Sequence, residues 1–222
     1  FSARLQSGEC AGLVGPNGAG KTTLALMLAG FLTPSSGHIR ALGRPLNPAN
    51  LQQIRSQIGF TFHDPNDQLF MPTVLEDVCF GPLNAGVPPS EAAAMSLRML
   101  EILEISSLAS RFPGHLSAGQ KRLATLAGVL VMNPSLLILD EPTAFLDPYA
   151  RRQVMERLRV LPQAKLIVTH DLELVCELCS KVMIISEGRL VSEGPPAAIL
   201  SRADLMEEYR LEVPCSLRRI SS

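Results

Sequence analysis

The sequence predicts one α/β domain built on a parallel sheet with helices on both faces. Three continuous apolar runs are typical of strands buried on both sides, at residues 136–139, 166–168 and 182–185. Helical stretches separate these strands, around residues 149–161 and 172–179. Because strands that alternate with helices along a chain form parallel sheets covered on both faces, this order predicts a layered architecture. A chain of 222 residues is long enough for one such domain and its core.

The segment that precedes residue 72 is predicted to supply further strands and one helix. Strand-like alternation covers residues 1–5 and 11–14. A Gly-rich loop then leads into a helix from about residue 21 to residue 32, which a Pro-Ser-Ser-Gly run ends. Another strand is predicted at residues 58–62.

Residues 72–132 are predicted to form a mainly helical insertion. Ser90 is expected to cap a helix whose first turn holds Glu91. At the other end of the chain, residues 214–222 have the composition of a frayed C-terminal tail. The expected apolar face of the helix after Ser90 consists of Leu97, Leu100, Ile102 and Leu103.

Composition argues against several classes of function. The net charge of -1 offers no surplus of positive charge for binding nucleic acid. The apolar stretch at residues 123–132 is shorter than the about 20 residues that a membrane-spanning helix needs, so a membrane role requires a partner. Cys176 and Cys179 form a CxxC pair, but no second pair completes a zinc site, and buried thiols are the preferred interpretation. The scattered cysteines are typical of a reducing cytosol.

Residues 15–22 match the phosphate-binding pattern G-x-x-x-x-G-K-[ST] without a gap. Glycines allow backbone N–H groups to turn inward around a phosphate, and the following helix adds its positive N-terminal dipole. Lys21 can reach the β and γ phosphates, and the Thr22 hydroxyl can ligate Mg²⁺. The alternative is an ordinary Gly-rich turn, but the strand predicted before it and the helix predicted after it favour a phosphate loop. The residues expected to bind nucleotide here are Gly15, Pro16, Asn17, Gly18, Ala19, Gly20, Lys21, Thr22 and Thr23.

Two acids follow the apolar run at residues 136–139. A buried parallel strand delivers the side chains after it to the C-terminal edge of the sheet, where α/β proteins bind ligands. Asp140 is expected to hold Mg²⁺, through water, and Glu141 to polarise an attacking water molecule. The alternative is a pair of ordinary solvated acids, and the presence of a phosphate loop in the same chain favours the catalytic interpretation.

The segment Leu116-Ser117-Ala118-Gly119-Gln120 points to a particular family. By itself, Ser-x-Gly-Gln can be an ordinary helix cap that offers a hydroxyl and a backbone N–H group to an anion. The segment closely resembles the LSGGQ signature of ABC ATPases, with Ala118 where glycine is usual. Ala-Phe-Leu-Asp, which ends at Asp147, resembles the D-loop of that family, and Thr-His-Asp around His170 resembles its H-loop. These motifs occur in the expected order and extend the resemblance over essentially the whole chain.

This resemblance implies a RecA-like P-loop NTPase core with a parallel-rich sheet, a small antiparallel β part and a helical subdomain. The core is expected at residues 1–71 and 133–213, the helical subdomain with the signature at residues 72–132, and the C-terminal tail at residues 214–222. The resemblance also implies ATP and Mg²⁺ as cofactors, and ATP hydrolysis between two subunits that pair head to tail.

The same resemblance implies roles for individual side chains. Lys21, Glu141 and His170 are expected to be catalytic, with His170 contacting the γ-phosphate. The signature segment is expected to reach the nucleotide that the other subunit holds. Besides the phosphate loop, the residues expected to contact nucleotide are His63, Ser117, Ala118, Gly119, Gln120 and Asp147.

The chain also departs from the family pattern. His63 takes the place of the Q-loop glutamine, which senses Mg²⁺ and the transport partner. Histidine can donate to water or phosphate but is a poor carbonyl-type ligand of Mg²⁺. Gln68 lies further along the chain and is not assumed to substitute. The aromatic residue that stacks on adenine in this family is expected to precede Phe1.

Residues 63–84 carry a narrower resemblance. They are similar to the N-P-D-D-Q-L-F, T-V and D-V-A-F-G-P-L-N pattern of energy-coupling-factor importers, which take up cobalt, nickel or vitamins. The implied partners are a second ABC ATPase, a transmembrane coupling subunit and a small membrane substrate-binding subunit, at the cytoplasmic face of the membrane and without nucleic acid. The open alternatives are another class of ABC importer, a soluble ABC ATPase outside transport, and a regulatory cassette that binds ATP but hardly cleaves it.

Overall fold

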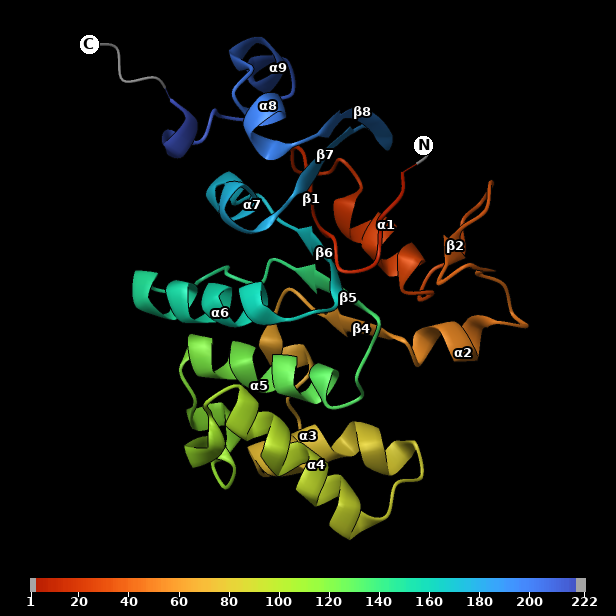
Figure 1. The fold of residues 1–222 in the computed structure, drawn as a ribbon, viewed down its shortest axis with the longest axis vertical. Helices are drawn as coiled ribbons and strands as arrows, with labels where there is room; N and C mark the ends of the chain where they lie inside the picture. The colour runs from red at the N-terminus through yellow and green to blue at the C-terminus, as the bar shows by residue number, and fades with distance from the viewer. Residues whose placement is uncertain (1–2, 219–222) are drawn as a thin grey trace.

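A computed structural model describes residues 3–218 and places a mostly parallel six-stranded sheet at the centre of the molecule (Figure 1). The strand order is β4-β5-β6-β1-β7-β8. All neighbouring pairs are parallel except β7 and β8, which run antiparallel. The strands are β1 (Cys10–Val14), β4 (Ile58–Thr61), β5 (Leu136–Asp140), β6 (Ala164–Val168), β7 (Lys181–Ser186) and β8 (Arg189–Gly194).

These strands confirm the predicted α/β class and its parallel sheet. The three apolar runs at residues 136–139, 166–168 and 182–185 lie within β5, β6 and β7. A small antiparallel pair, β2 (Arg40–Ala41) with β3 (Arg44–Pro45), lies apart from the main sheet. Together with the β7–β8 pair, it supplies the expected antiparallel part.

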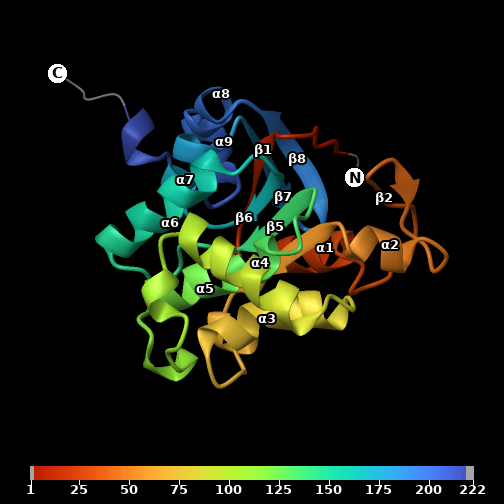
Figure 2. The ribbon, with the colours of Figure 1, turned by 60° about the horizontal axis from the view of Figure 1, so that its bottom comes forward.

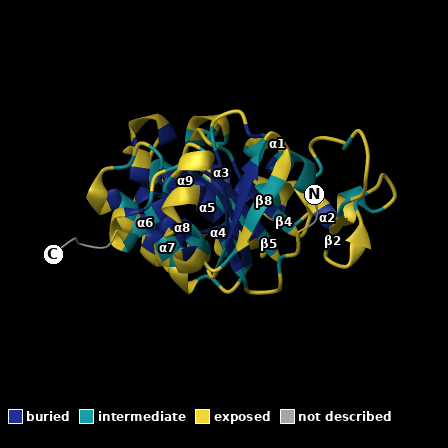
Figure 3. Cartoon of the chain, turned by 90° about the horizontal axis from the view of Figure 1, so that it is seen from above, coloured by how far each residue is buried: buried dark blue, intermediate teal, exposed yellow. Residues whose placement is uncertain are grey.

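Helices cover both faces of the sheet. On one face, α1 (Lys21–Leu28) packs against alternate residues of the strands, such as Leu13 and Ile138. On the other face, α6 (Pro148–Val160) and α7 (Leu172–Leu178) cover the residues that point the opposite way, such as Val14 and Leu139. Figure 2 shows α1 and the α6–α7 pair on opposite sides of the strands, and Figure 3 shows the buried sheet between them. This two-sided burial explains why the strand segments are continuously apolar.

Three of the remaining helices form a group at one end of the molecule. The helices α3 (Val74–Asn84), α4 (Pro89–Ile102) and α5 (Ala118–Leu130) lie together beyond the β4 edge of the sheet (Figure 1). This arrangement confirms the predicted helical character of residues 72–132. Short helices complete the fold, namely α2 (Leu51–Arg55), α8 (Pro196–Leu200), α9 (Ala203–Glu208) and the 3-10 turns η1 (Pro65–Asp67), η2 (Ser106–Leu108), η3 (Pro113–His115) and η4 (Cys215–Leu217).

Several predicted helix details are wrong. The helix that begins at Lys21 ends at Leu28, because Gly30 takes a left-handed φ of 77° and its N–H donates to the Met27 carbonyl. Helix α4 begins at Pro89 with Pro88 at the cap position, so Ser90 is not its cap. Leu100 and Leu103 are buried as expected. Two residues of the predicted apolar face are instead exposed, Leu97 and Ile102.

Both described ends of the chain also differ from the sequence-based expectation. Residues 3–5 belong to no strand, and the rest of the predicted strand at residues 1–5 lies outside the described residues. The predicted frayed tail is wrong for residues 214–218, because Pro214 is buried and Ser216 donates two hydrogen bonds to the Glu173 carboxylate, at 3.1 and 2.6 Å. Residues 219–222 lie outside the described part.

The cysteines pair differently from the CxxC pattern. The Cys179 sulfur lies 3.6 Å from the sulfur of Cys10, and both residues are buried. Cys176 is half-buried. Among the described residues, no group of three or more His, Cys, Asp or Glu side chains is arranged to hold a metal. No helix in the described part of the chain is long and apolar enough to cross a membrane.

Candidate functional site

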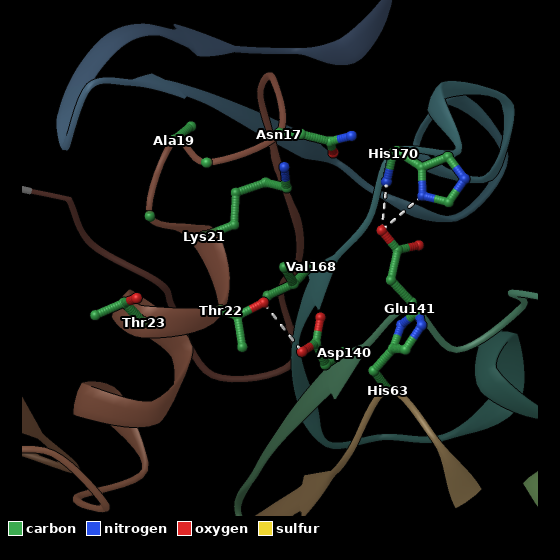
Figure 4. Close-up of a pocket in the computed structure, with 12 residues that line it drawn as sticks. Asn17, Ala19, Lys21, Thr22, Thr23, His63, Asp140, Glu141, Val168 and His170 are labelled. Carbon is green, nitrogen blue, oxygen red and sulfur yellow. Dashed lines mark hydrogen bonds and ion pairs between the residues drawn. The ribbon is translucent and has the colours of Figure 1, made fainter.

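The C-terminal edge of the sheet carries a cavity of about 650 Å³ (Figure 4). The loops that follow β1, β4, β5 and β6 all reach it, because parallel strands end at the same edge. The sequence-predicted residues from these four loops therefore meet at one place. The cavity is lined by Asn17, Gly18, Ala19, Gly20, Lys21, Thr22, Thr23, His63, Asp140, Glu141, Val168 and His170.

The phosphate loop (residues 15–20) joins β1 to the first turn of α1. Gly15 has a φ of 151°, and a Cβ at this position would lie 2.0 Å from the Ile185 carbonyl oxygen, so no larger residue fits. Gly20, at the helix cap, has a left-handed φ of 96°. These two conformations turn the loop around the N-terminus of α1, where free N–H groups and the helix dipole favour an anion.

Lys21 folds back over the phosphate loop. Its Nζ donates to the carbonyl oxygens of Gly15 at 2.8 Å and Pro16 at 3.0 Å. Burial lowers the pKa of Lys21, whereas the carboxylates of Glu141 and Asp140 oppose this shift. Among residues 3–218, the ammonium group thus has two neutral carbonyl acceptors at the cavity, and an anionic ligand would bind it more strongly.

Thr22 and Asp140 bring two oxygen donors together at the floor of the cavity. The Thr22 hydroxyl donates to Asp140 Oδ2 at 3.2 Å, which Figure 4 marks with a dashed line. Asp140 is buried, and burial raises the pKa of its carboxyl group, an effect that the Thr22 hydrogen bond opposes. A hydroxyl and a carboxylate side by side are hard oxygen donors of the kind that Mg²⁺ takes.

The two residues that follow the neighbouring strand β6 hold the Glu141 side chain in place. Its backbone has a left-handed φ of 48°, and its carboxylate accepts from the Thr169 hydroxyl at 2.8 Å and the His170 N–H at 3.0 Å. The His170 Nδ1 atom lies 2.7 Å from Glu141 Oε1 (Figure 4). The His170 side chain itself is largely exposed at the cavity, so the residue predicted to contact phosphate is in contact with Glu141 in this structure.

His63 and Gln68 take different positions. His63 lines the cavity, and its ring lies edge-to-face with Phe145 at 5.6 Å between centroids. Gln68 instead binds the end of β4, because its Oε1 accepts from the Phe62 N–H at 2.9 Å and its Nε2 donates to the Phe60 carbonyl at 3.1 Å. With both polar atoms of its amide engaged, Gln68 does not substitute for His63 at the cavity.

The signature segment (residues 116–120) does not reach this cavity within the chain. Ser117 caps α5, accepting from the Gln120 N–H at 3.3 Å, while the Gln120 side chain accepts from the Ser117 N–H at 3.0 Å. Asp147 caps α6 through the N–H groups of Tyr149 and Ala150, both at 2.9 Å. A separate cavity of about 300 Å³ is lined in part by Ser117, Gly119, Gln120 and Asp147. The phosphate loop and the signature segment therefore border two different cavities of this chain.

Two residues of the site were missed by sequence reasoning. Thr169 is buried between β6 and His170, and its position directly after an apolar strand was the available signal. Arg122 is 3% exposed and donates to the carbonyl oxygens of Phe62, His63 and Glu141. The feature of the sequence that could have indicated its role is its place directly before the apolar stretch of α5.

Comparison with known proteins identifies the family. The family described as ABC transporter matches residues 1–144. A Geobacter sulfurreducens protein, named as an ABC transporter ATP-binding protein, is 45% identical over 97% of this chain and 86% of its own length. The energy-coupling factor transporter ATP-binding protein EcfA1 of Methanospirillum hungatei is 37% identical over 95% of this chain and 77% of its own length.

Solved structures agree with this assignment. The structure of cbiO1 from Clostridium perfringens, described as part of the ABC transporter complex cbiONQ, superposes with a TM-score of 0.84 at 35% identity, covering 94% of this chain and 85% of its own. The ATP-binding cassette MJ0796, in a dimeric post-hydrolysis state with ADP and Pi, gives a TM-score of 0.77 at 25% identity, covering 87% and 88%. The chain with the cavity at its sheet edge belongs to the ABC transporter ATP-binding family and is an ATP hydrolase of the P-loop type.

Proposed function

We propose that this chain is the Mg-ATP-hydrolysing subunit of an ABC importer of the energy-coupling-factor type. The observation that carries the proposal is the single cavity in which Lys21, Thr22, Asp140, Glu141 and His170 meet. In this proposal residues 1–71 and 133–213 form the core that binds nucleotide, and residues 72–132 form the helical subdomain.

The triphosphate binds over the phosphate loop. Backbone N–H groups of residues 15–20 and the first turn of α1 receive the phosphates, with Thr23 beside them, and Lys21 exchanges its two carbonyl acceptors for phosphate oxygens. Thr22 and Asp140, which already lie 3.2 Å apart, would hold Mg²⁺, Asp140 through water. When bound there, Mg²⁺ would supply positive charge against the negative charge of the phosphate oxygens.

Hydrolysis depends on the orientation of Glu141. Its carboxylate accepts a hydrogen bond, and then the proton, from the attacking water molecule. The oxygen of that water forms the new bond to the γ-phosphorus as the bond to the ADP oxygen breaks. Thr169 and His170 hold that carboxylate at the cavity, and His170 turns its ring to the γ-phosphate when nucleotide is bound. His63 contributes a donor to the same cavity in place of the family's glutamine.

A second ATPase subunit completes the site. Ser117, Ala118, Gly119 and Gln120 lie at the N-terminus of α5, and with Asp147 they belong to a cavity separate from the phosphate loop of the same chain. A helix N-terminus attracts phosphate oxygens, so the γ-phosphate of one subunit meets α5 of the other. Closure around two ATP molecules is then the step that ATP binding drives.

A transmembrane coupling subunit docks beside the Q-loop. An apolar groove of about 290 Å³ lies between η1 and the helices α3 and α5. Phe70 is 61% exposed and lies edge-to-face with Phe80 at 4.9 Å, which makes an aromatic anchor at the groove. Asp77 accepts the N–H groups of Phe70 and Met71, both at 3.0 Å, and so holds this loop in place.

The relatives support the importer type. Two of them are named energy-coupling factor transporter ATP-binding proteins, and cbiO1 is described as part of the cbiONQ complex. By this likeness the chain serves import of cobalt, nickel or a vitamin, with a coupling subunit and a small membrane substrate-binding subunit, at the cytoplasmic face of the membrane.

Phe70→Asp should uncouple the chain from its membrane partner. We expect at least about tenfold less membrane subunit to copurify, because a carboxylate placed in an apolar groove must be desolvated. The measurement is copurification and metal or vitamin uptake after coexpression with the membrane proteins of the neighbouring genes. Leu97→Asp, at an exposed apolar position outside the groove, is the matched control. Unchanged copurification of the Phe70 variant would contradict the docking site.

The same experiment tests the alternative functions. Uptake of another solute would indicate a different class of ABC importer. Association of the chain with ribosomes or DNA would indicate a soluble ABC ATPase.

Thr169→Val should lower kcat for ATP hydrolysis about tenfold, which corresponds to about 1.4 kcal/mol. The substitution keeps the shape of the buried side chain but removes the 2.8 Å hydrogen bond to Glu141 Oε2, together with the acceptor of the Asp171 N–H at 2.9 Å. Steady-state hydrolysis by the assembled transporter measures the effect. Thr61→Val is the control, since the buried Thr61 hydroxyl has no hydrogen-bond partner among the described residues. Equal activity of the two variants would show that Thr169 does not orient Glu141.

A further inference from the structure

Arg122 is a buried cation that joins three separate segments of the chain. It lies in the first half of α5, and only 3% of its surface is exposed. Its Nη1 donates to the Phe62 carbonyl at 2.8 Å, and its Nη2 donates to the carbonyls of His63 at 2.8 Å and Glu141 at 3.1 Å. One guanidinium group therefore connects the signature helix to the Q-loop and to the backbone after β5.

The acceptors of this guanidinium are unusual because all three are neutral carbonyl groups. Burying a cation without a hydrogen-bonded carboxylate is costly, and Arg122 Nε has no partner among the described residues. Burial lowers the pKa of Arg122, while the carboxylates of Asp64, Asp140 and Glu141 oppose that shift. Core packing alone would favour an apolar side chain at this position. The presence of arginine is therefore explained by its rigid set of N–H donors, which reach three carbonyl groups at once.

Glu141 is held at both of its ends by this arrangement. Thr169 and the His170 N–H bind its carboxylate, whereas Arg122 binds its backbone carbonyl. Its left-handed φ of 48° is unfavourable for a residue with a side chain and persists only where the surroundings impose it. The carbonyl contact from Arg122 is one of these constraints.

The place of Arg122 on α5 links its contact with Glu141 to the position of the signature segment. Gly119, in the first turn of α5, and Ser117, at its cap, precede Arg122 by slightly less and slightly more than about one helical turn, and a capping box fixes this end of the helix. A displacement of the helix N-terminus therefore displaces the guanidinium and, with it, the carbonyls of His63 and Glu141.

We propose that Arg122 is a positioning residue that transmits docking of the signature segment to Glu141. The inference rests on the proposed role of Glu141 in hydrolysis. When a second subunit's nucleotide seats on the α5 N-terminus, Arg122 sets the main chain at Glu141 and His63 in the geometry that hydrolysis requires.

The test is the kinetics of Arg122→Ala and Arg122→Lys in the full chain, assembled with its membrane partner. We expect kcat of the alanine variant to fall about 100-fold, with KM for ATP within about threefold of wild type, because misplacement of a reacting group costs rate more than binding. The lysine variant should be intermediate, since one ammonium cannot span three carbonyls. Added guanidinium ion should restore at least about fivefold of the activity lost in Arg122→Ala, because it can occupy the vacated space.

A double-mutant cycle with Glu141→Gln separates positioning from a general structural role. If Arg122 acts through Glu141, Arg122→Ala should lower single-turnover hydrolysis less than about threefold in the Glu141→Gln background, since residues that act as a unit are not additive. Arg98→Ala, which removes an exposed guanidinium from α4, is the control and should retain wild-type rates.

Four outcomes would overturn the inference. They are a wild-type kcat for folded Arg122→Ala, a raised KM with unchanged kcat, the full loss repeated in the Glu141→Gln background, and no response to guanidinium. If Arg122→Ala does not fold, Arg122→Lys decides, and an unchanged kcat rejects the role. Failure of Glu141→Gln to slow hydrolysis would instead reject the proposed function, so the two failures are distinguishable.

Discussion

Glu141→Gln is expected to lower kcat for ATP hydrolysis by about 10²- to 10⁴-fold while ATP still binds. Glutamine keeps the length of the side chain and one oxygen to accept from the His170 N–H, so the cavity should keep its shape. It cannot accept a proton from water as a carboxylate can. The bound triphosphate then persists, and two chains should remain closed around it.

Two measurements check this expectation. Single-turnover hydrolysis by the assembled transporter reports the rate, and light scattering of the full chain without its membrane partner reports whether two subunits pair when Mg-ATP is added. Glu156→Gln, which makes the same change at an exposed position of α6, should behave as wild type. Unchanged turnover of the Glu141 variant would reject its catalytic role, and slow turnover without stable pairing would reject the closed, shared site.

Lys21→Ala is expected to weaken Mg-ATP binding by about 30- to 1000-fold. Lys21 Nζ is a charged donor that lies within the phosphate loop, 2.8 Å from the Gly15 carbonyl, and it is placed to meet the β and γ phosphates. Loss of one or two charge-assisted hydrogen bonds of this kind costs about 2–4 kcal/mol. Hydrolysis should fall further than binding, because negative charge develops on the departing ADP oxygen in the transition state.

Equilibrium binding of a fluorescent ATP analogue with Mg²⁺ measures the first effect directly. Arg189→Ala removes a cation from an exposed position of β8 and is the matched control. Wild-type affinity of the Lys21 variant would show that the phosphates bind elsewhere. A similar loss in the Arg189 variant would indicate a general electrostatic effect instead.

Local pattern and strand order explain why most of the site was predictable. Lys21, Asp140 and His170 lie at or beyond the C-terminal ends of buried strands, and parallel strands necessarily end at one edge of a sheet. Their convergence therefore follows from the class of fold alone. Helix ends were less predictable, since α1 stops at a left-handed Gly30 and α4 starts at two prolines.

Contacts between distant segments were not predictable in this way. Nothing near Leu97 and Ile102 in the sequence indicates that these apolar residues face solvent while Leu100 and Leu103 face the core. The sequence predicts that Ser216 belongs to a frayed tail, whereas in the structure it donates two hydrogen bonds to Glu173 of α7. Exposure and pairing of this kind depend on which helix packs alongside.

The sequence by itself determined the α/β class, the phosphate loop and the two acids at the end of β5, because each depends on residues that are neighbours in the chain. The tertiary structure alone decided what holds Glu141, since Thr169 and Arg122 reach it from β6 and α5. It also decided that the signature segment lies apart from the phosphate loop of its own chain. The physical reason is that strand periodicity depends on residues close together in the chain. The hydrogen bonds from Arg122 and Thr169 to Glu141 join residues 19 and 28 positions apart, and they form only when the chain has packed.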